Sequence, residues 1–123
     1  MSKANLILLT GGTGFVGRQV LKDLLKSRKK VRLIVRENNL TEFAGKPGIE
    51  KVITTRDLFT ENVSWWKKAF EDVDTVVHAA WYAEPGKYLQ SLKNLDCLVG
   101  TLQMAKGAVG AGIRRLVAIG TCF

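Results

Sequence analysis

The sequence is poor in the residues from which disulfides and metal centres are built. Its 123 residues include two cysteines, Cys97 and Cys122, and a single histidine, His78. The cysteines lack the Cys-x-x-Cys spacing of a redox or zinc site, and the histidine has no obvious partner for binding a metal. We therefore expect neither a disulfide nor a metal site.

Long apolar runs are also missing. The chain starts MSKANLILLTGG, in which glycines follow a short apolar stretch. This stretch is shorter than the apolar segment of a secretory signal and much shorter than a membrane span. We expect a cytoplasmic protein with no membrane partner. With 46% hydrophobic and 24% charged residues, the composition suits one soluble domain.

Aromatic residues are absent from the most basic part of the chain. Much of the net charge of +8 lies in KSRKKVRLIVR, residues 26–36. Basic residues near the C-terminal end of a helix interact favourably with the helix dipole, which explains most of this cluster. Because no aromatic side chains alternate with the basic ones to stack on bases, we expect no nucleic-acid partner.

Short apolar runs and segments of helical spacing alternate along the chain. Nearly continuous apolar runs are typical of parallel strands that are covered on both faces. The alternation predicts an α/β fold with a doubly wound parallel sheet, and right-handed crossovers favour the strand order 3-2-1-4-5. Strands are expected at residues 5–10, 31–35, 51–54, 73–80 and 116–120, and helices from residue 15 onward, at 62–71 and at 88–109.

A glycine-rich turn, TGGTGFVG at residues 10–17, stands between the first strand and the first helix. Gly11 permits the tight turn, Gly14 lets the backbone approach a pyrophosphate, and Gly17 lets helix and strand pack closely. The N-terminus of the following helix offers unpaired N–H groups and the positive end of a dipole to an anion. In this context the motif predicts a Rossmann fold that binds a dinucleotide rather than a turn that only connects two elements.

Five motifs follow one another in an order known from one enzyme family. They are the Thr-Gly-x-x-Gly-x-x-Gly loop, Arg56-Asp57-Leu58, His78-Ala79-Ala80, Gly100-Thr101 and Ile119-Gly120-Thr121. Together they resemble the extended short-chain dehydrogenase/reductase family, the NAD(P)-dependent epimerases and dehydratases that modify nucleotide sugars. The resemblance spans essentially the whole chain. It implies that residues 1–123 are the N-terminal fragment of such an enzyme, an NAD(P)-binding Rossmann domain whose C-terminal substrate domain is absent.

The resemblance also implies contacts between the chain and its cofactor. Asp57 is expected to meet the adenine amino group, although an aspartate at such a position also caps turns. Trp81 lies just beyond the fourth strand, where open α/β sheets place ligands. The residues expected to bind the cofactor on these grounds are Gly11, Thr13, Gly14, Phe15, Val16, Gly17, Asp57, Leu58, Ala79, Ala80 and Trp81.

The residues at the end of the second strand indicate which dinucleotide the site binds. A site for NAD usually has a carboxylate here, which accepts hydrogen bonds from the ribose hydroxyls. The strand pattern places Val35 at this position and Arg36 after it. Because a guanidinium can bind a 2′-phosphate through two hydrogen bonds, we predict NADP as the cofactor and Arg36 as its contact. NAD stays the alternative through Glu37, and the alternative interpretation of Arg36 is a solvated residue at a strand end.

The resemblance implies a catalytic set of Ser/Thr, Tyr and Lys, of which Thr121 would be the hydroxyl member. The set would transfer a proton to or from the substrate oxygen while hydride passes between the nicotinamide and an alcohol or carbonyl substrate, such as a nucleotide sugar. The tyrosine and lysine would lie beyond residue 123, so the 123-residue chain is expected to be inactive. In the full-length form the family commonly dimerises through its long helix and the helix after it, which predicts a homodimer.

Two positions depart from the family pattern, and a second hypothesis stays open. The helix asparagine of the family falls on Cys97, with Asn94 three residues earlier, and Gly120 stands where many members carry a serine before the catalytic hydroxyl. The chain could instead be a dinucleotide-binding or sensor module that carries out no catalysis. A Tyr-x-x-x-Lys motif in the gene after Phe123 would favour the enzyme.

Overall fold

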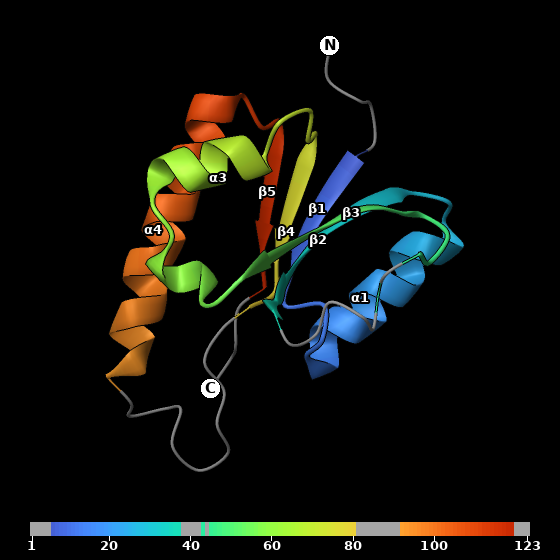
Figure 1. Ribbon diagram of the computed structural model, residues 1–123, viewed down its shortest axis with the longest axis horizontal. Coiled ribbons are helices and arrows are strands. Elements are labelled where there is room, and N and C mark those ends of the chain that lie inside the picture. Colours follow the sequence, from blue (N-terminus) through green and yellow to red (C-terminus); the bar gives the residue numbers. More distant parts are fainter. Residues whose placement is uncertain (1–5, 38–42, 44, 81–91, 120–123) are drawn as a thin grey trace.

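A computed structural model of the protein describes residues 6–37, 43, 45–80 and 92–119. Five strands form one sheet in the order β3-β2-β1-β4-β5, and all neighbouring strands run parallel. Helices cover both faces of this sheet (Figure 1). The doubly wound parallel sheet and the strand order predicted from the sequence are therefore confirmed.

Strands and helices alternate along the described part of the chain as the sequence pattern predicts, except that β2 is followed by β3 with no helix described between them. Strand β3 begins earlier than predicted because its pairing with β2 already starts opposite Val31. The start predicted for the last helix, residues 88–91, lies outside the described residues. The elements are β1 (Leu6–Thr10), α1 (Phe15–Lys26), β2 (Lys30–Arg36), β3 (Ile49–Thr55), the 3-10 helix η2 (Leu58–Thr60), α3 (Val63–Ala69), β4 (Thr75–His78), α4 (Lys93–Ala111) and β5 (Arg115–Ala118).

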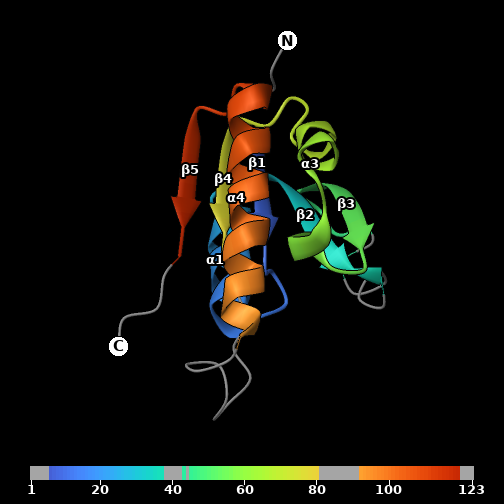
Figure 2. The same ribbon diagram turned by 90° about the vertical axis from the view of Figure 1, so that its left-hand side faces the viewer.

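The sheet lies between two layers of helices (Figures 1 and 2). An apolar core packs on each face of the sheet. Leu8 of β1 faces α3 and α4 and packs in a cluster with Trp66 and Met104. Its neighbour Leu9 packs on the opposite face in a cluster with Leu21 of α1. Successive side chains of a strand point to opposite faces, so a strand covered on both sides needs apolar residues at nearly every position.

Helix α4 approaches the rest of the protein through its glycines. A Cβ at Gly100 would lie 2.5 Å from the Cα of Phe59, and one at Gly107 would lie 2.5 Å from the Cβ of Trp66. The large apolar residues at helical spacing on α4 are instead exposed: Leu95 by 58%, Leu98 by 48%, Leu102 by 54% and Val109 by 83%.

One basic residue of the segment 26–36 is buried. The Arg32 guanidinium donates to both carboxylate oxygens of Glu50, at 2.9 Å each. It also donates to the carbonyl oxygens of Ala69 at 2.8 Å and Glu71 at 2.7 Å. Arg32 therefore ties β2 to β3 and to the end of α3. Arg32 is a residue of the segment that the helix dipole does not explain, because it lies inside β2 and not at the helix end.

Within the described ranges, none of the helices combines the length and the apolar character that crossing a membrane requires.

Candidate functional site

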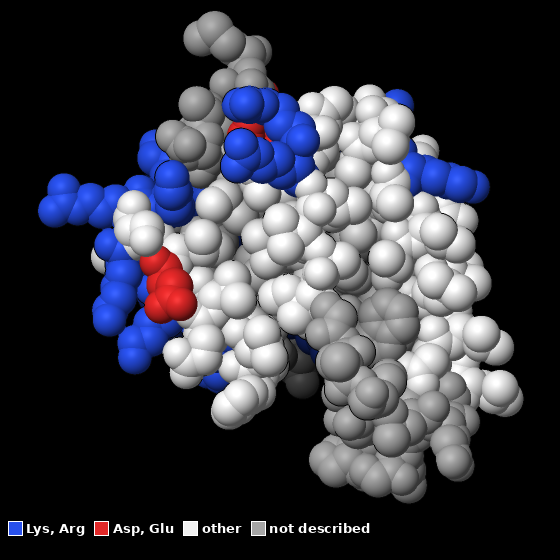
Figure 3. All heavy atoms as spheres, turned by 180° about the vertical axis from the view of Figure 1, so that it is seen from behind, with Lys and Arg blue, Asp and Glu red and all other residues white. Residues whose placement is uncertain are grey.

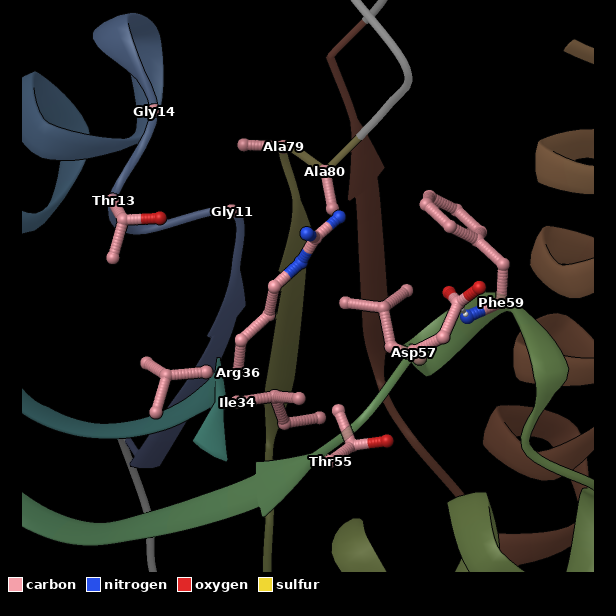
Figure 4. Close-up of a pocket in the computed structure, with 12 residues that line it drawn as sticks. Gly11, Thr13, Gly14, Ile34, Arg36, Thr55, Asp57, Phe59, Ala79 and Ala80 are labelled. Atoms are coloured by element: carbon pink, nitrogen blue, oxygen red, sulfur yellow. Dashed lines mark hydrogen bonds between the residues drawn. The ribbon is translucent and has the colours of Figure 1, made fainter. Parts of the chain in front are cut away.

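The carboxyl ends of β1, β2, β3 and β4 surround an open cavity of about 370 Å³ (Figure 4). This place lies beside the point at which the strand order reverses, between β1 and β4, where doubly wound sheets bind their ligands. The lining residues predicted from the sequence are Gly11, Thr13, Gly14, Arg36, Asp57, Leu58, Ala79 and Ala80. Four further lining residues, Ile34, Val35, Thr55 and Phe59, were not predicted. Their positions at or just after strand ends are the signal that could have indicated them.

The glycines of the turn after β1 meet different constraints. Gly11 has a φ of +73°, and a Cβ on it would lie 2.6 Å from the backbone nitrogen of Ala80. A Cβ on Gly17 would overlap the carbonyl oxygen of Gly11. A Cβ on Gly14, by contrast, would come no closer than 3.5 Å to any neighbouring atom. The protein itself thus requires glycine at 11 and 17, whereas at 14 it leaves room for a group that approaches the backbone from outside.

Helix α1 begins at this loop without a side-chain cap. Its N-cap is Gly14, and its first turn contains no acidic residue. The unpaired N–H groups and the positive end of the helix dipole are therefore available to an anion. The Arg18 Nε donates to the carbonyl oxygen of Thr13 at 2.9 Å and so braces the loop.

Three other residues predicted to bind the cofactor lie at the start of α1 and do not line the cavity. Phe15 is 89% exposed and Val16 is 47% exposed. Gly17 is buried, where it allows the helix to pack on the loop.

Of the described residues that line the cavity, two are charged: Arg36 at the end of β2 and Asp57 just after β3. Arg36 ends β2, and its side chain extends into the space between Gly11 and Asp57 (Figure 4). Asp57 follows β3, and its Oδ1 accepts the backbone N–H of Phe59 at 2.9 Å. Asp57 therefore caps η2, as one interpretation of the sequence predicts, while it also lines the cavity.

Most of the positive charge lies away from this cavity. Lys and Arg side chains gather at the side of the molecule where α1 ends and β2 begins (Figure 3). Lys26, Arg28 and Lys30 are exposed there. Because the strands are parallel, this region lies toward the opposite edge of the sheet from the cavity. Arg36 thus contributes positive charge where a ligand would bind.

A buried network joins the ends of β1 and β4 behind the cavity. The Oγ1 of Thr10 lies 2.7 Å from the Nδ1 of His78, and it accepts the backbone N–H groups of Ala79 at 3.1 Å and Ala80 at 3.2 Å. The Nε2 of His78 lies 3.1 Å from the Oγ1 of Thr101 on α4. Burial lowers the pKa of His78 to about 4, so the ring is neutral near pH 7. The His78-Ala79-Ala80 motif did not indicate these partners of His78.

Two predicted site residues, Trp81 and Thr121, lie outside the described residues. Among the residues that are described, no group of three or more His, Cys, Asp and Glu side chains could hold a metal ion.

The model of the NAD dependent epimerase/dehydratase family matches residues 7–123. The chain belongs to this family. The resemblance stated from the five sequence motifs is thereby confirmed, and with it a general assignment to NAD-dependent proteins of the epimerase and dehydratase type.

Relatives of this family member include both curated proteins and solved structures. The NRPS-like oxidoreductase fscA of Fusarium equiseti is 37% identical over 65 residues, which are 53% of this chain and 5% of that protein. The UDP-N-acetylglucosamine 4-epimerase from Bacillus cereus has a TM-score of 0.71 at 21% identity, covering 96% of this chain and 39% of its own. MoeE5, solved in complex with UDP-glucose and NAD, has a TM-score of 0.64 at 26% identity, covering 91% and 35%. The chain thus spans less than half the length of these solved structures and a small part of the curated relative.

Proposed function

We propose that the chain is the dinucleotide-binding part of an NAD(P)-dependent epimerase, dehydratase or reductase. The observation that carries this proposal is the space at Gly14, which stands between two glycines that the fold itself requires. Membership of the family supports it. The proposed substrate is a nucleotide sugar or a similar alcohol or carbonyl compound, which the UDP-glucose complex of MoeE5 supports.

The residues around the cavity fit a dinucleotide in three places. The loop from Gly11 to Gly14 and the uncapped start of α1 would hold the pyrophosphate through backbone N–H groups. Asp57 and Leu58 would meet the adenine, since both line the cavity beyond β3. Thr13, Ala79 and Ala80 would contact the part of the dinucleotide between the pyrophosphate and the adenine. Phe15 and Val16 would contact the cofactor from the start of α1.

Arg36 would select NADP over NAD. Its guanidinium extends into the cavity and can donate two hydrogen bonds to a 2′-phosphate. Val35, the residue before it, is 4% exposed and offers no carboxylate to a ribose 2′-hydroxyl. NAD stays the alternative cofactor of this proposal.

Catalysis would combine the cofactor with residues outside the described part of the chain. When bound, the nicotinamide supplies hydride transfer. Thr121 would hold the substrate oxygen as the hydroxyl member of a Ser/Thr-Tyr-Lys set, and Trp81 would lie against the ligand. The proposal includes a cytoplasmic location.

The full-length form would assemble as a homodimer. Support comes from α4, whose Leu95, Leu98, Leu102 and Val109 are all at least 48% exposed. Light scattering on the full-length protein measures its mass, and a monomer would contradict this part of the proposal.

Calorimetric titration with NADPH and with NADH tests the central proposal. The 123-residue chain should bind both, NADPH more tightly, and should show no turnover. If neither dinucleotide binds, the proposal is wrong, and tighter binding of NADH would overturn the role of Arg36. Sequencing of the gene beyond residue 123 tests the enzyme assignment, because a non-catalytic sensor module would lack the Tyr-x-x-x-Lys motif.

A further inference from the structure

The hydroxyl group of Thr10 uses all of its hydrogen-bonding capacity. A hydroxyl has two lone pairs and one hydrogen. The N–H groups of Ala79 and Ala80 point at its oxygen, at 3.1 Å and 3.2 Å, and occupy both lone pairs. Its hydrogen is therefore left for the Nδ1 of His78, 2.7 Å away. The Nδ1 must be the acceptor in this bond.

This arrangement determines the tautomer of His78. Because Nδ1 accepts, the ring proton of the neutral imidazole lies on Nε2. The Nε2 is 3.1 Å from the Oγ1 of Thr101, which can accept that proton's hydrogen bond. The edge-to-face contact with the ring of Phe59, with centroids 6.0 Å apart, further restricts how the imidazole lies. Both ring nitrogens are thus engaged in a buried site.

The network also reaches the glycine loop. The N–H of Ala79 has a second acceptor, the carbonyl oxygen of Thr10 at 3.2 Å, whereas the Thr10 hydroxyl is the acceptor for Ala80. Ala80 in turn lies so close to Gly11 that a Cβ there would be 2.6 Å from its nitrogen. Ala79 and Ala80, which directly follow β4, form the side of the cavity that we call the β4 wall. A shift of Ala80 would therefore move this wall.

We propose that His78 is a positioning residue for dinucleotide binding: as the Nε2-protonated tautomer it fixes the Thr10 hydroxyl, which holds Ala80 and thereby the β4 wall of the cavity. This inference rests on the proposed function, since it concerns affinity for the dinucleotide. His78 does not itself line the cavity and acts through Thr10.

Nitrogen NMR tests the tautomer directly. His78 is the single histidine of the chain, so its two ring nitrogens need no assignment by mutation. We expect one protonated nitrogen, Nε2, and one unprotonated nitrogen, Nδ1, with and without NADP. A proton on Nδ1 would overturn the inference whether or not a dinucleotide binds.

Two amide substitutions test the positioning role. In His78→Asn the amide oxygen can take the place of Nδ1 and accept from Thr10, whereas in His78→Gln the amide reaches toward Thr101 and leaves Thr10 without its acceptor. We expect His78→Gln to weaken NADPH binding about tenfold and His78→Asn to weaken it less than about threefold, by calorimetry. A general structural role would give both variants the same loss, and that result would overturn the inference.

Substitutions of Thr10 keep the test decisive if a His78 variant does not fold. Thr10→Val removes the hydroxyl at similar volume and should weaken binding about tenfold, while Thr10→Ser should restore it. Thr75→Val is the matched control, since Thr75 lies at the other end of β4 and bonds Asp74 at 3.0 Å. If Thr10→Val binds as well as Thr10→Ser, the inference alone fails. If wild type binds no dinucleotide, the proposed function fails and the inference with it.

Discussion

Gly17 lies so close to the carbonyl oxygen of Gly11 that no Cβ fits between them. Residues six positions apart thus close the loop on itself, with Gly14 at its outer side. Within one motif, Gly17 is therefore needed for packing and Gly14 is proposed to be needed for ligand binding. Substitutions at the two positions can distinguish these roles.

Alanine at position 17 should affect folding, and alanine at position 14 should affect binding. Gly17→Ala forces the loop and α1 apart and should lower the free energy of unfolding by about 1–3 kcal/mol. Gly14→Ala should lower it by less than about 1 kcal/mol, the usual effect of alanine at an N-cap, yet weaken NADPH binding. Urea unfolding and calorimetry measure the two effects. Equal binding by Gly14→Ala and wild type would contradict the assignment of the loop.

Replacing Arg36 should change which dinucleotide is preferred. Arg36→Ala should weaken NADPH binding by roughly 1–3 kcal/mol through the lost charged hydrogen bonds, and NADH binding much less. Arg56→Ala is the matched control, because Arg56 is also exposed after a strand but is not among the lining residues. An equal loss for both dinucleotides would rule out a contact with the 2′-phosphate.

Two ion pairs among the described residues, Arg32–Glu50 and Arg114–Asp74, should differ strongly in what they contribute to stability. Arg32→Met removes the guanidinium that bonds the Glu50 carboxylate and two backbone carbonyl groups in a largely buried site, and should cost about 3–5 kcal/mol of unfolding free energy. Arg114→Ala removes a bond of 3.3 Å to Asp74 from a side chain that is 73% exposed, and should cost less than about 1 kcal/mol. Urea unfolding compares them, and similar losses would show that Arg32 does not link the strands.

Stability should fall on mild acidification because of His78. Its pKa is about 4 in the folded chain against an ordinary 6.5, so the unfolded chain takes up the proton first. This stability is complete above the unfolded pKa and is lost as the pH falls toward the folded pKa. Between about pH 7.5 and about pH 5 the loss should be about 2 kcal/mol. His78→Asn should remove this slope, and a wild-type curve that is flat over this interval would contradict the neutral buried ring.

The change in stability when a glycine of α4 is replaced by alanine should depend on which atoms the new Cβ meets. Gly100→Ala places a Cβ 2.5 Å from the backbone of Phe59 and should destabilise by about 1–3 kcal/mol. At Gly110 the Cβ would meet the side chain of Lys67 at 3.2 Å, which can move aside. Because alanine favours helix over glycine, Gly110→Ala should be neutral or stabilising by up to about 1 kcal/mol. Thermal unfolding of both variants checks the difference.

The sequence predicted the parts of the site that depend on local pattern. The glycine loop, the end of the second strand and the Asp57-Leu58 step are each recognisable within a few residues, and the structure brings them to one cavity. Phe59 and Thr55 were missed because nothing in their neighbourhood distinguishes them from other strand-end residues. The sequence pattern also could not predict that Leu95 and Leu98 on α4 are exposed, because helical spacing shows an apolar stripe but not which face of the helix a neighbour covers.

The sequence by itself determined the order of strands and helices, the parallel sheet and the edge of the sheet at which the cavity lies. These follow from periodicity, glycine placement and the handedness of crossovers, which act over short stretches. Tertiary structure alone decided the partners of Arg32 and His78. Glu50 lies 18 positions from Arg32, and Thr10 lies 68 positions from His78. A buried polar group must find a hydrogen-bond partner, and the folded sheet decides which distant residue that partner is.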